Sequence, residues 1–182
     1  MNWYKKAQNI IDKEIALNNL KQWIGNSVVV DGSGDPIVCY KGMPATDWRT
    51  NALLEIIDRS ASDTASSFGG GSYAGFFSSS SEVASHFAKV LTYEGLGNGV
   101  FPVFLKIERP FVIDANQGFA GNFQFGKEGE PFREALKNDS YDGIIIKNTV
   151  DEADIYVPKT PYQIKSIFNS GLYNPDDPKI NQ

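Results

Sequence analysis

The residue types best suited to chemistry gather in one short segment, residues 72–90. It combines a glycine-rich stretch, the adjacent aromatic residues Phe76 and Phe77, four consecutive serines and the start of an amphipathic helix. Glycine lets a ligand approach the backbone closely, an aromatic ring offers a flat stacking face, and hydroxyl and free N–H groups at a helix start bind polar or anionic groups. Together these features suit a planar ring attached to a ribose and phosphates.

Charged residues that could take part in binding or catalysis lie before and after this segment in the sequence. Lys41 follows an apolar strand pattern and stands between Tyr40 and Gly42. Glu152 and Asp154 are two residues apart, so alternation along a strand would place both carboxylates on one face. Two plainer alternatives stay open: the two acids belong to an exposed turn, and Lys41 is a solvent-facing lysine at a strand end.

Composition excludes several classes of function. The 182 residues suit one domain with a genuine core, and a net charge of −5 argues against nucleic-acid binding through a basic surface. The single cysteine, Cys39, cannot form an intramolecular disulfide, and with one histidine, His86, no structural zinc site is expected. No signal peptide or membrane span is apparent. We therefore expect a cytoplasmic, monomeric protein with no metal and no membrane partner.

Periodicity predicts an α+β fold, with helices mostly early and an antiparallel-rich sheet late. Helices are expected over residues 3–24, 47–59 and 131–137. A further helix should start with the capping-box pattern Ser79-x-x-Glu82 and bury Val83, Phe87 and Leu91. A glycine- and serine-rich loop should cover residues 60–72. Strands are expected over 28–30 and 36–40 as a hairpin, and over 99–107, 110–114, 143–147, 153–157 and 163–168.

Five segments in one order give the chain a family resemblance. They are residues 30–42, 75–88, 102–114, 141–148 and 156–166. In that order they resemble the ADP-ribosyltransferase domain of phage and mobile-element polyvalent proteins, which is related to the diphtheria-toxin and poly(ADP-ribose) polymerase group. The resemblance implies an ADP-ribosyltransferase-like fold, with two small, mainly antiparallel sheets forming an NAD cleft flanked by helices. We expect residues 1–25 to be a helical segment packed on the domain and residues 26–182 to be the domain itself.

The resemblance also implies roles for particular residues. Lys41 stands where the family has His or Arg, as a catalytic residue and a cation for the phosphates. Phe77 and Phe87 match the aromatic pair that sandwiches the nicotinamide. Asp154 matches the acid that stabilises the oxocarbenium-like transition state, and Glu152 matches the acid that serves the acceptor. The remaining implied NAD contacts are Tyr40, Gly42 and Ser78.

Two functions follow, from different classes. The first is an NAD-dependent mono-ADP-ribosyltransferase that modifies a host macromolecule, a protein rather than a nucleic acid, with NAD glycohydrolase activity when water is the acceptor. The second is a catalytically lapsed module that keeps the fold and binds a nucleotide or a partner protein. The second rests on three departures from the family pattern, Lys41 for His or Arg, Phe77 for Tyr and Asp154 for Glu.

Overall fold

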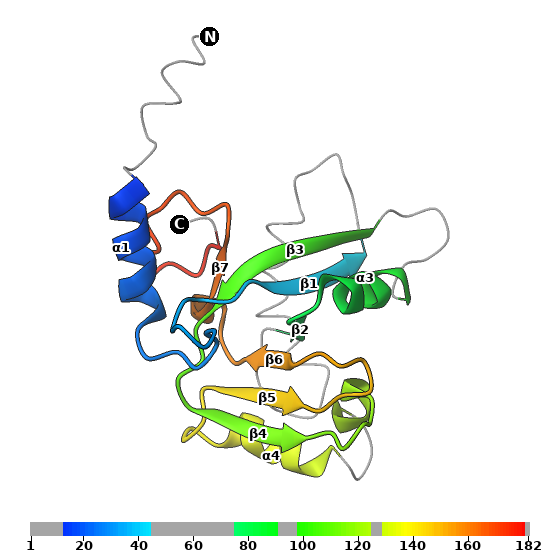
Figure 1. The fold of residues 1–182 in the computed structure, drawn as a ribbon. Coiled ribbons are helices and arrows are strands. Elements are labelled where there is room, and N and C mark those ends of the chain that lie inside the picture. Colours follow the sequence, from blue (N-terminus) through cyan, green and yellow to red (C-terminus); the bar gives the residue numbers. More distant parts are fainter. Residues whose placement is uncertain (1–12, 45–74, 91–97, 125–128, 181–182) are drawn as a thin grey trace.

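The computed structural model describes residues 13–44, 75–90, 98–124 and 129–180. Figure 1 shows a central twisted sheet with helices on its outside. The helices are α1 (Lys13–Ile24), α3 (Ser81–Val90) and α4 (Glu130–Lys137), with short 3₁₀ turns at Ala120–Gln124 and Pro161–Gln163. The helix expected over 47–59, the loop expected over 60–72 and the first ten residues of the expected 3–24 helix lie outside the described residues.

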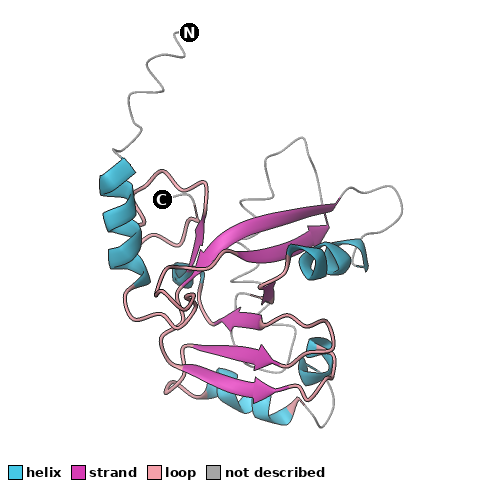
Figure 2. Ribbon diagram, in the orientation of Figure 1, coloured by secondary structure: helices cyan, strands magenta, loops and turns pink. Residues whose placement is uncertain are grey.

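Seven strands form the sheet (Figure 2), in the order β4-β5-β6-β2-β1-β3-β7. Five of the six strand pairs are antiparallel, and only β4 and β5 run parallel. This confirms an α+β fold with a mainly antiparallel sheet. The strands are β1 (Cys39–Pro44), β2 (Phe77–Ser78), β3 (Asn98–Leu105), β4 (Pro110–Asp114), β5 (Gly143–Lys147), β6 (Ile155–Pro158) and β7 (Ile164–Ser166).

The strand groups β4-β5-β6 and β1-β3-β7 meet through β2, which is only two residues long. Tyr40 of β1 pairs with Ser78, and Phe77 pairs with Tyr156 of β6. The two expected sheets are therefore joined into one, because β2 pairs with both groups. A strand this short lets the groups twist apart while the backbone hydrogen bonding stays continuous.

The two faces of the sheet carry different cores. One face holds a cluster that includes Cys39, Phe77, Ile145 and Tyr156. The opposite face holds a second cluster, in which helix α4 contributes Phe132, Ala135 and Leu136 against strands β5 and β6. Since side chains alternate along a strand, each strand residue near β2 can be assigned to one of these two faces.

Helix α3 begins one residue later than its sequence pattern suggested. The Val83 backbone N–H donates to Ser80 Oγ at 3.3 Å, so Ser80 acts as the N-cap. Ser79 is engaged elsewhere, because its hydroxyl accepts the Asp154 N–H at 3.0 Å. The buried stripe also differs from the expected Val83, Phe87 and Leu91: Ala84 and Ala88 are the buried helix residues, and Leu91 lies outside the described residues.

Helix α1 ends where predicted, with Gly25 at a φ of 53°. Its buried residues Leu20, Trp23 and Ile24 pack with Tyr173 and the half-buried Phe104. The first helix is thus held against both a sheet residue and the C-terminal segment.

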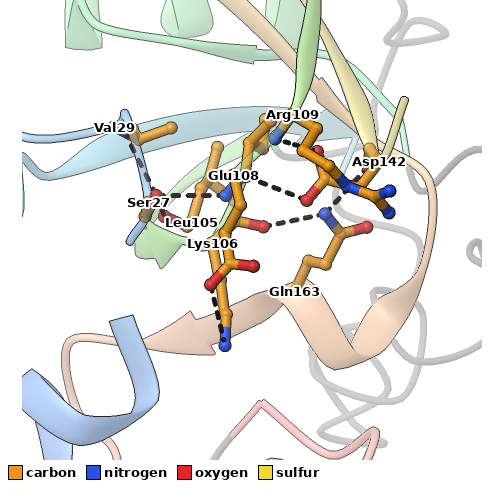
Figure 3. Close-up of polar contacts among 9 residues, drawn as sticks. Ser27, Val29, Leu105, Lys106, Glu108, Arg109, Asp142 and Gln163 are labelled. Carbon is orange, nitrogen blue, oxygen red and sulfur yellow. Dashed lines mark hydrogen bonds and ion pairs between the residues drawn. The ribbon is translucent and has the colours of Figure 1, made fainter. Parts of the chain in front are cut away.

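A polar network ties the connection between β3 and β4 to the residues just before β5 and β7 (Figure 3). The Asp142 carboxylate accepts the backbone N–H groups of Glu108 and Arg109, each at 2.8 Å. Gln163 Nε2 donates to the Lys106 carbonyl at 2.8 Å and to the Asp142 carbonyl at 2.9 Å. These bonds fix the β3–β4 connection, so that β4 can run parallel to β5.

Candidate functional site

Lys41 points to the same face of the sheet as Phe77. Its Nζ lies 5.0 Å from the centroid of the Phe77 ring, a cation–π contact. Gly75, at a φ of 104°, lets the chain pass beside this ammonium, because a Cβ there would overlap Lys41 Nζ. Desolvation by burial lowers the pKa of Lys41 from 10.5 to about 8. The residue is therefore neither the solvent-facing lysine of the plain alternative nor a freely hydrated cation.

Phe77 and Phe87 lie on opposite sides of the sheet. Phe77 is 1% exposed and belongs to the cluster with Cys39 and Tyr156. Phe87 is 38% exposed and stands on α3, which packs on the other face, where a Cβ added to Gly42 would overlap the Ala84 carbonyl. The structure does not bring the two rings together, and a sandwich between them is incompatible with this arrangement.

Three other expected contact residues face the α3 side. Tyr40 and Ser78 are paired across β1 and β2, and Gly42 follows Tyr40 by two residues. Ser78 Oγ accepts the Ser80 N–H at 3.0 Å, in a buried position before the helix. Tyr40, Gly42 and Ser78 are thus separated from Lys41 by the thickness of the sheet.

Asp154 immediately precedes β6, and both its backbone N–H and its backbone carbonyl form hydrogen bonds with Ser79. The Ser79 N–H donates to the Asp154 carbonyl at 2.9 Å, and the Asp154 N–H donates to Ser79 Oγ at 3.0 Å. Lys147 Nζ on strand β5 lies 4.0 Å from Asp154 Oδ2. Desolvation by burial raises the pKa of Tyr156, and the nearby charge of Asp154 acts in the same direction.

Glu152 adopts a conformation that the sequence pattern did not suggest. It has a φ of 53° and is exposed, and its N–H donates to the Thr149 carbonyl at 3.0 Å in a turn. Because β6 begins at Ile155, strand alternation does not relate Glu152 to Asp154. The argument from a shared strand face was wrong, and the acidic-turn alternative describes the backbone of Glu152.

The structure does place Lys41 and Asp154 on one face. The register aligns Lys41 with Phe77 and Tyr156 across β1, β2 and β6, and Asp154 precedes Tyr156 by two residues. Neighbouring strands are about 4.8 Å apart, so the backbones of β1 and β6, which lie on either side of β2, are separated by about 10 Å. A cation and a carboxylate at this spacing can contact different parts of one extended ligand.

Two residues of this face were missed at the level of sequence, Tyr156 and Lys147. Tyr156 was open to prediction, because alternation from Asp154 leads to it directly. Lys147 could not be predicted from the sequence, because its position beside Asp154 depends on the pairing of β5 with β6.

Other kinds of site find no support in the part of the chain that the structure covers. Among the described residues, no group of three or more His, Cys, Asp or Glu side chains could hold a metal ion. None of the described helices has the length and apolar character needed to cross a bilayer. Two surface cavities, of about 360 and 340 Å³, border Tyr141, and none of the candidate site residues lines them.

Comparison with known proteins assigns the family. No curated protein and no solved structure matches the chain significantly. Residues 31–172 match the family model described as ADP-ribosyltransferase in polyvalent proteins. This match covers most of the chain, including β1, the serine cluster, Asp154 and all seven strands. The chain therefore belongs to the ADP-ribosyltransferase family of polyvalent proteins.

Proposed function

We propose that the protein is an NAD-dependent mono-ADP-ribosyltransferase that modifies a host macromolecule in the cytoplasm. The observation that supports this most is the convergence of Lys41 and Asp154 on one face, in a chain of this family. With a net charge of −5, the acceptor is a protein rather than a nucleic acid. Hydrolysis of NAD by water is the expected side reaction, and the protein acts as a monomer.

In this proposal Asp154 performs the central electrostatic task. The bond between nicotinamide and ribose breaks as positive charge develops on the ribose, and a carboxylate fixed beside that charge stabilises the transition state. The two backbone hydrogen bonds to Ser79 support this role, since they fix the start of the Asp154 side chain before the substrate arrives. Glu152, exposed two residues earlier, orients or deprotonates the acceptor.

Lys41 would contact the phosphates of NAD, and this requires it to move. Its ammonium now covers a face of the Phe77 ring, where a pyridinium would otherwise stack. A lysine has a flexible four-carbon stem, so turning the ammonium toward a phosphate would uncover the ring. Phe77 is then the stacking residue, and Tyr40, Gly42 and Ser78 support the site from the opposite face.

One observation favours a second candidate, a lapsed enzyme that binds a nucleotide or a partner protein. Phe77 is buried among core residues and already has a cation on its ring. If that contact is permanent, nicotinamide has no stacking face there.

The experiment that separates the two candidates uses substitutions of Asp154. The protein is incubated with labelled NAD and a bacterial lysate, and released nicotinamide and labelled protein are measured. We expect Asp154→Asn to lower kcat by at least about a hundredfold while the affinity for NAD changes little, because the charge acts in the transition state. Asp35→Asn, at an exposed turn acid, is the matched control.

Three results would each count against one or both of these assignments. Activity equal in wild type and Asp154→Asn would contradict the assignment of Asp154. An inert wild type whose Asp154→Glu variant is active would identify a lapsed enzyme. Calorimetry with no binding at millimolar NAD would contradict both the enzyme and the nucleotide-binding module.

A further inference from the structure

Strand β4 lies at the edge of the sheet (Figure 1), and β5 is its only neighbour among the described strands. The Ala115 N–H, just after β4, donates to the Lys147 carbonyl at 2.8 Å. Because backbone groups along a strand point alternately to its two sides, those of Val112 and Asp114 point away from β5. Val112 is also 53% exposed. The outer side of β4 therefore presents backbone donors and acceptors around an exposed apolar residue.

A surface cavity of about 360 Å³ lies between β4 and helix α4. Phe111 of β4 and Tyr141 form one wall, with ring centroids 5.1 Å apart in an edge-to-face contact. The other lining residues belong to α4 and its C-cap: Pro131, Glu134, Ala135, Lys137 and Asn138. Phe111 and Val112 are adjacent in the strand, so their side chains lie on opposite faces. A strand added along β4 would place alternate side chains beside the cavity and beside Val112.

The edge is protected against pairing only at its ends. Natural edge strands avoid pairing with other chains through proline and charged side chains. Strand β4 begins with Pro110 and ends with the exposed Asp114, while Val112 between them is apolar. Outward backbone groups are matched by another extended chain, and a pocket for one of its alternate side chains adds specificity. The edge therefore suits an extended peptide segment that carries a large apolar side chain.

The two ends of β4 carry opposite charges. At one end, Asp114 Oδ1 accepts the Asn116 N–H at 2.9 Å and the Asn148 side-chain amide at 3.1 Å. At the other end, Arg109 is exposed. A segment that pairs antiparallel is complementary when a basic residue lies opposite Asp114 and an acidic residue further along lies near Arg109.

The Asp114 end of β4 leads directly to the proposed catalytic acid. Asp114 aligns with Lys147 on β5, and Lys147 Nζ lies 4.0 Å from Asp154 Oδ2. Neighbouring strands are about 4.8 Å apart, so a strand added outside β4 would lie about 14 Å from the Asp154 backbone. An extended chain covers about 3.3 Å per residue, so about five residues bridge this distance.

We propose that the outer edge of β4 and the cavity beside it bind an extended segment of the acceptor protein, which adds antiparallel as a further strand. The identity of the partner rests on the proposed function, while the pairing itself can be tested without NAD. The residue that is modified lies N-terminal to the paired segment, because that part of an antiparallel chain leaves the edge at Asp114, toward Asp154.

The probe is a fluorescently labelled peptide, Lys-Thr-Val-Phe-Glu. Paired antiparallel, it places its lysine opposite Asp114, its valine opposite Val112, its phenylalanine beside the cavity and its glutamate near Arg109. We expect fluorescence anisotropy to give a dissociation constant below about 1 mM. Methylation of the valine nitrogen removes the donor to the Val112 carbonyl and should weaken binding at least about tenfold. Alanine in place of the phenylalanine should weaken binding by a similar factor, because the cavity then stays unfilled.

Substitutions at Val112 test the same pairing from the side of the protein. Val112→Pro removes the outward N–H without removing a hydrogen bond to β5, and should weaken peptide binding at least about tenfold. Val112→Thr keeps the N–H and the branched side chain, and it is the matched control that should bind as wild type does. No binding at about 1 mM peptide, or equal binding of the peptide and its N-methyl form to wild type, overturns the proposal even if Val112→Pro does not fold.

Competition connects the edge with transfer. Saturating peptide should lower the labelling of lysate protein from NAD about tenfold, while nicotinamide release without lysate changes less than about twofold. Peptide binding without this inhibition would overturn the assignment of the edge to the acceptor. Self-association that sedimentation detects in wild type and not in Val112→Pro would assign the edge to a second copy and also overturn it. A wild type without nicotinamide release would overturn the proposed function, while peptide binding would still decide the pairing.

Discussion

Among single residues, Lys41 makes the protein's stability depend on pH. Its pKa is about 8 in the folded protein and 10.5 in the unfolded chain, because burial disfavours the ammonium. Below pH 8 both states are charged and the desolvation cost is present in full. Between pH 8 and 10.5 only the folded state releases the proton, so stability rises with pH, and above 10.5 the cost is gone.

Lys41→Met removes this dependence. We expect the variant to be more stable than wild type at pH 7 by on the order of 2 kcal/mol, after the lost cation–π contact is subtracted. The difference between the two proteins should shrink as the pH approaches 10. Urea unfolding at pH 7, 8.5 and 9.5 measures it, below the range in which tyrosines ionise. A constant difference across that range would show that Lys41 does not titrate near 8.

For single residues, the sequence could predict which residue types belong to the site but not which face of the sheet each side chain lies on. Asp154 and Lys41 were predicted as the acid and the cation, and both lie on one face. Phe77 and Phe87 were paired by the family resemblance, although a strand residue and a residue of the following helix need not lie on the same side of the sheet. The positive φ of Glu152 follows from the turn at Thr149, which no pattern of hydrophobicity reveals.

Among the elements, the contact between α3 and β1 depends on Gly42. A Cβ at this position would overlap the Ala84 carbonyl of the helix backbone, so the helix would have to move. We expect Gly42→Ala to lower the free energy of unfolding by about 2–3 kcal/mol, as overpacking in a core does.

Gly32→Ala is the matched control for this change. A Cβ at Gly32 meets nothing within 4 Å, so its effect should stay within about 0.5 kcal/mol or be slightly stabilising. Denaturant unfolding of both variants tests the difference. Equal effects at the two glycines would mean that α3 adjusts freely over β1.

The helices and strands whose sequence has a strong apolar pattern were predicted close to their observed bounds. An element whose sequence has little pattern was not predicted. The strand expected over residues 143–147 and the helix after Pro131 are present, because buried strands and amphipathic helices have clear periodicity. Strand β2 could not be predicted, since two residues carry no periodicity and its existence depends on pairing with both β1 and β6. That short strand is what joins the two expected sheets.

In the whole molecule, the C-terminal segment completes the core although the family match ends at residue 172. Ile180 is buried in the cluster with Phe77 and Tyr156, and its carbonyl accepts the Ser166 N–H at 2.8 Å. Tyr173 packs against α1. This segment therefore connects the first helix, the edge strand β7 and the face of the sheet that carries Lys41 and Asp154.

Lys165 fastens this segment to β7. Its side chain is fully buried, and Nζ donates to the Asp177 carbonyl at 2.7 Å and to the Lys179 carbonyl at 2.9 Å. Hydrogen bonds from a charged donor contribute about 1.5–3 kcal/mol each, and 1.4 kcal/mol is a tenfold change in an equilibrium.

We expect Lys165→Met to keep the apolar stem packed but to raise protease cleavage within residues 174–180 at least about tenfold. Lys106→Met, which removes a surface pair with Glu108, is the control and should leave cleavage unchanged. Limited proteolysis followed by mass spectrometry locates the cuts. If Lys165→Met resists cleavage as well as wild type does, the burial of Ile180, rather than the two ammonium hydrogen bonds, holds the segment in place.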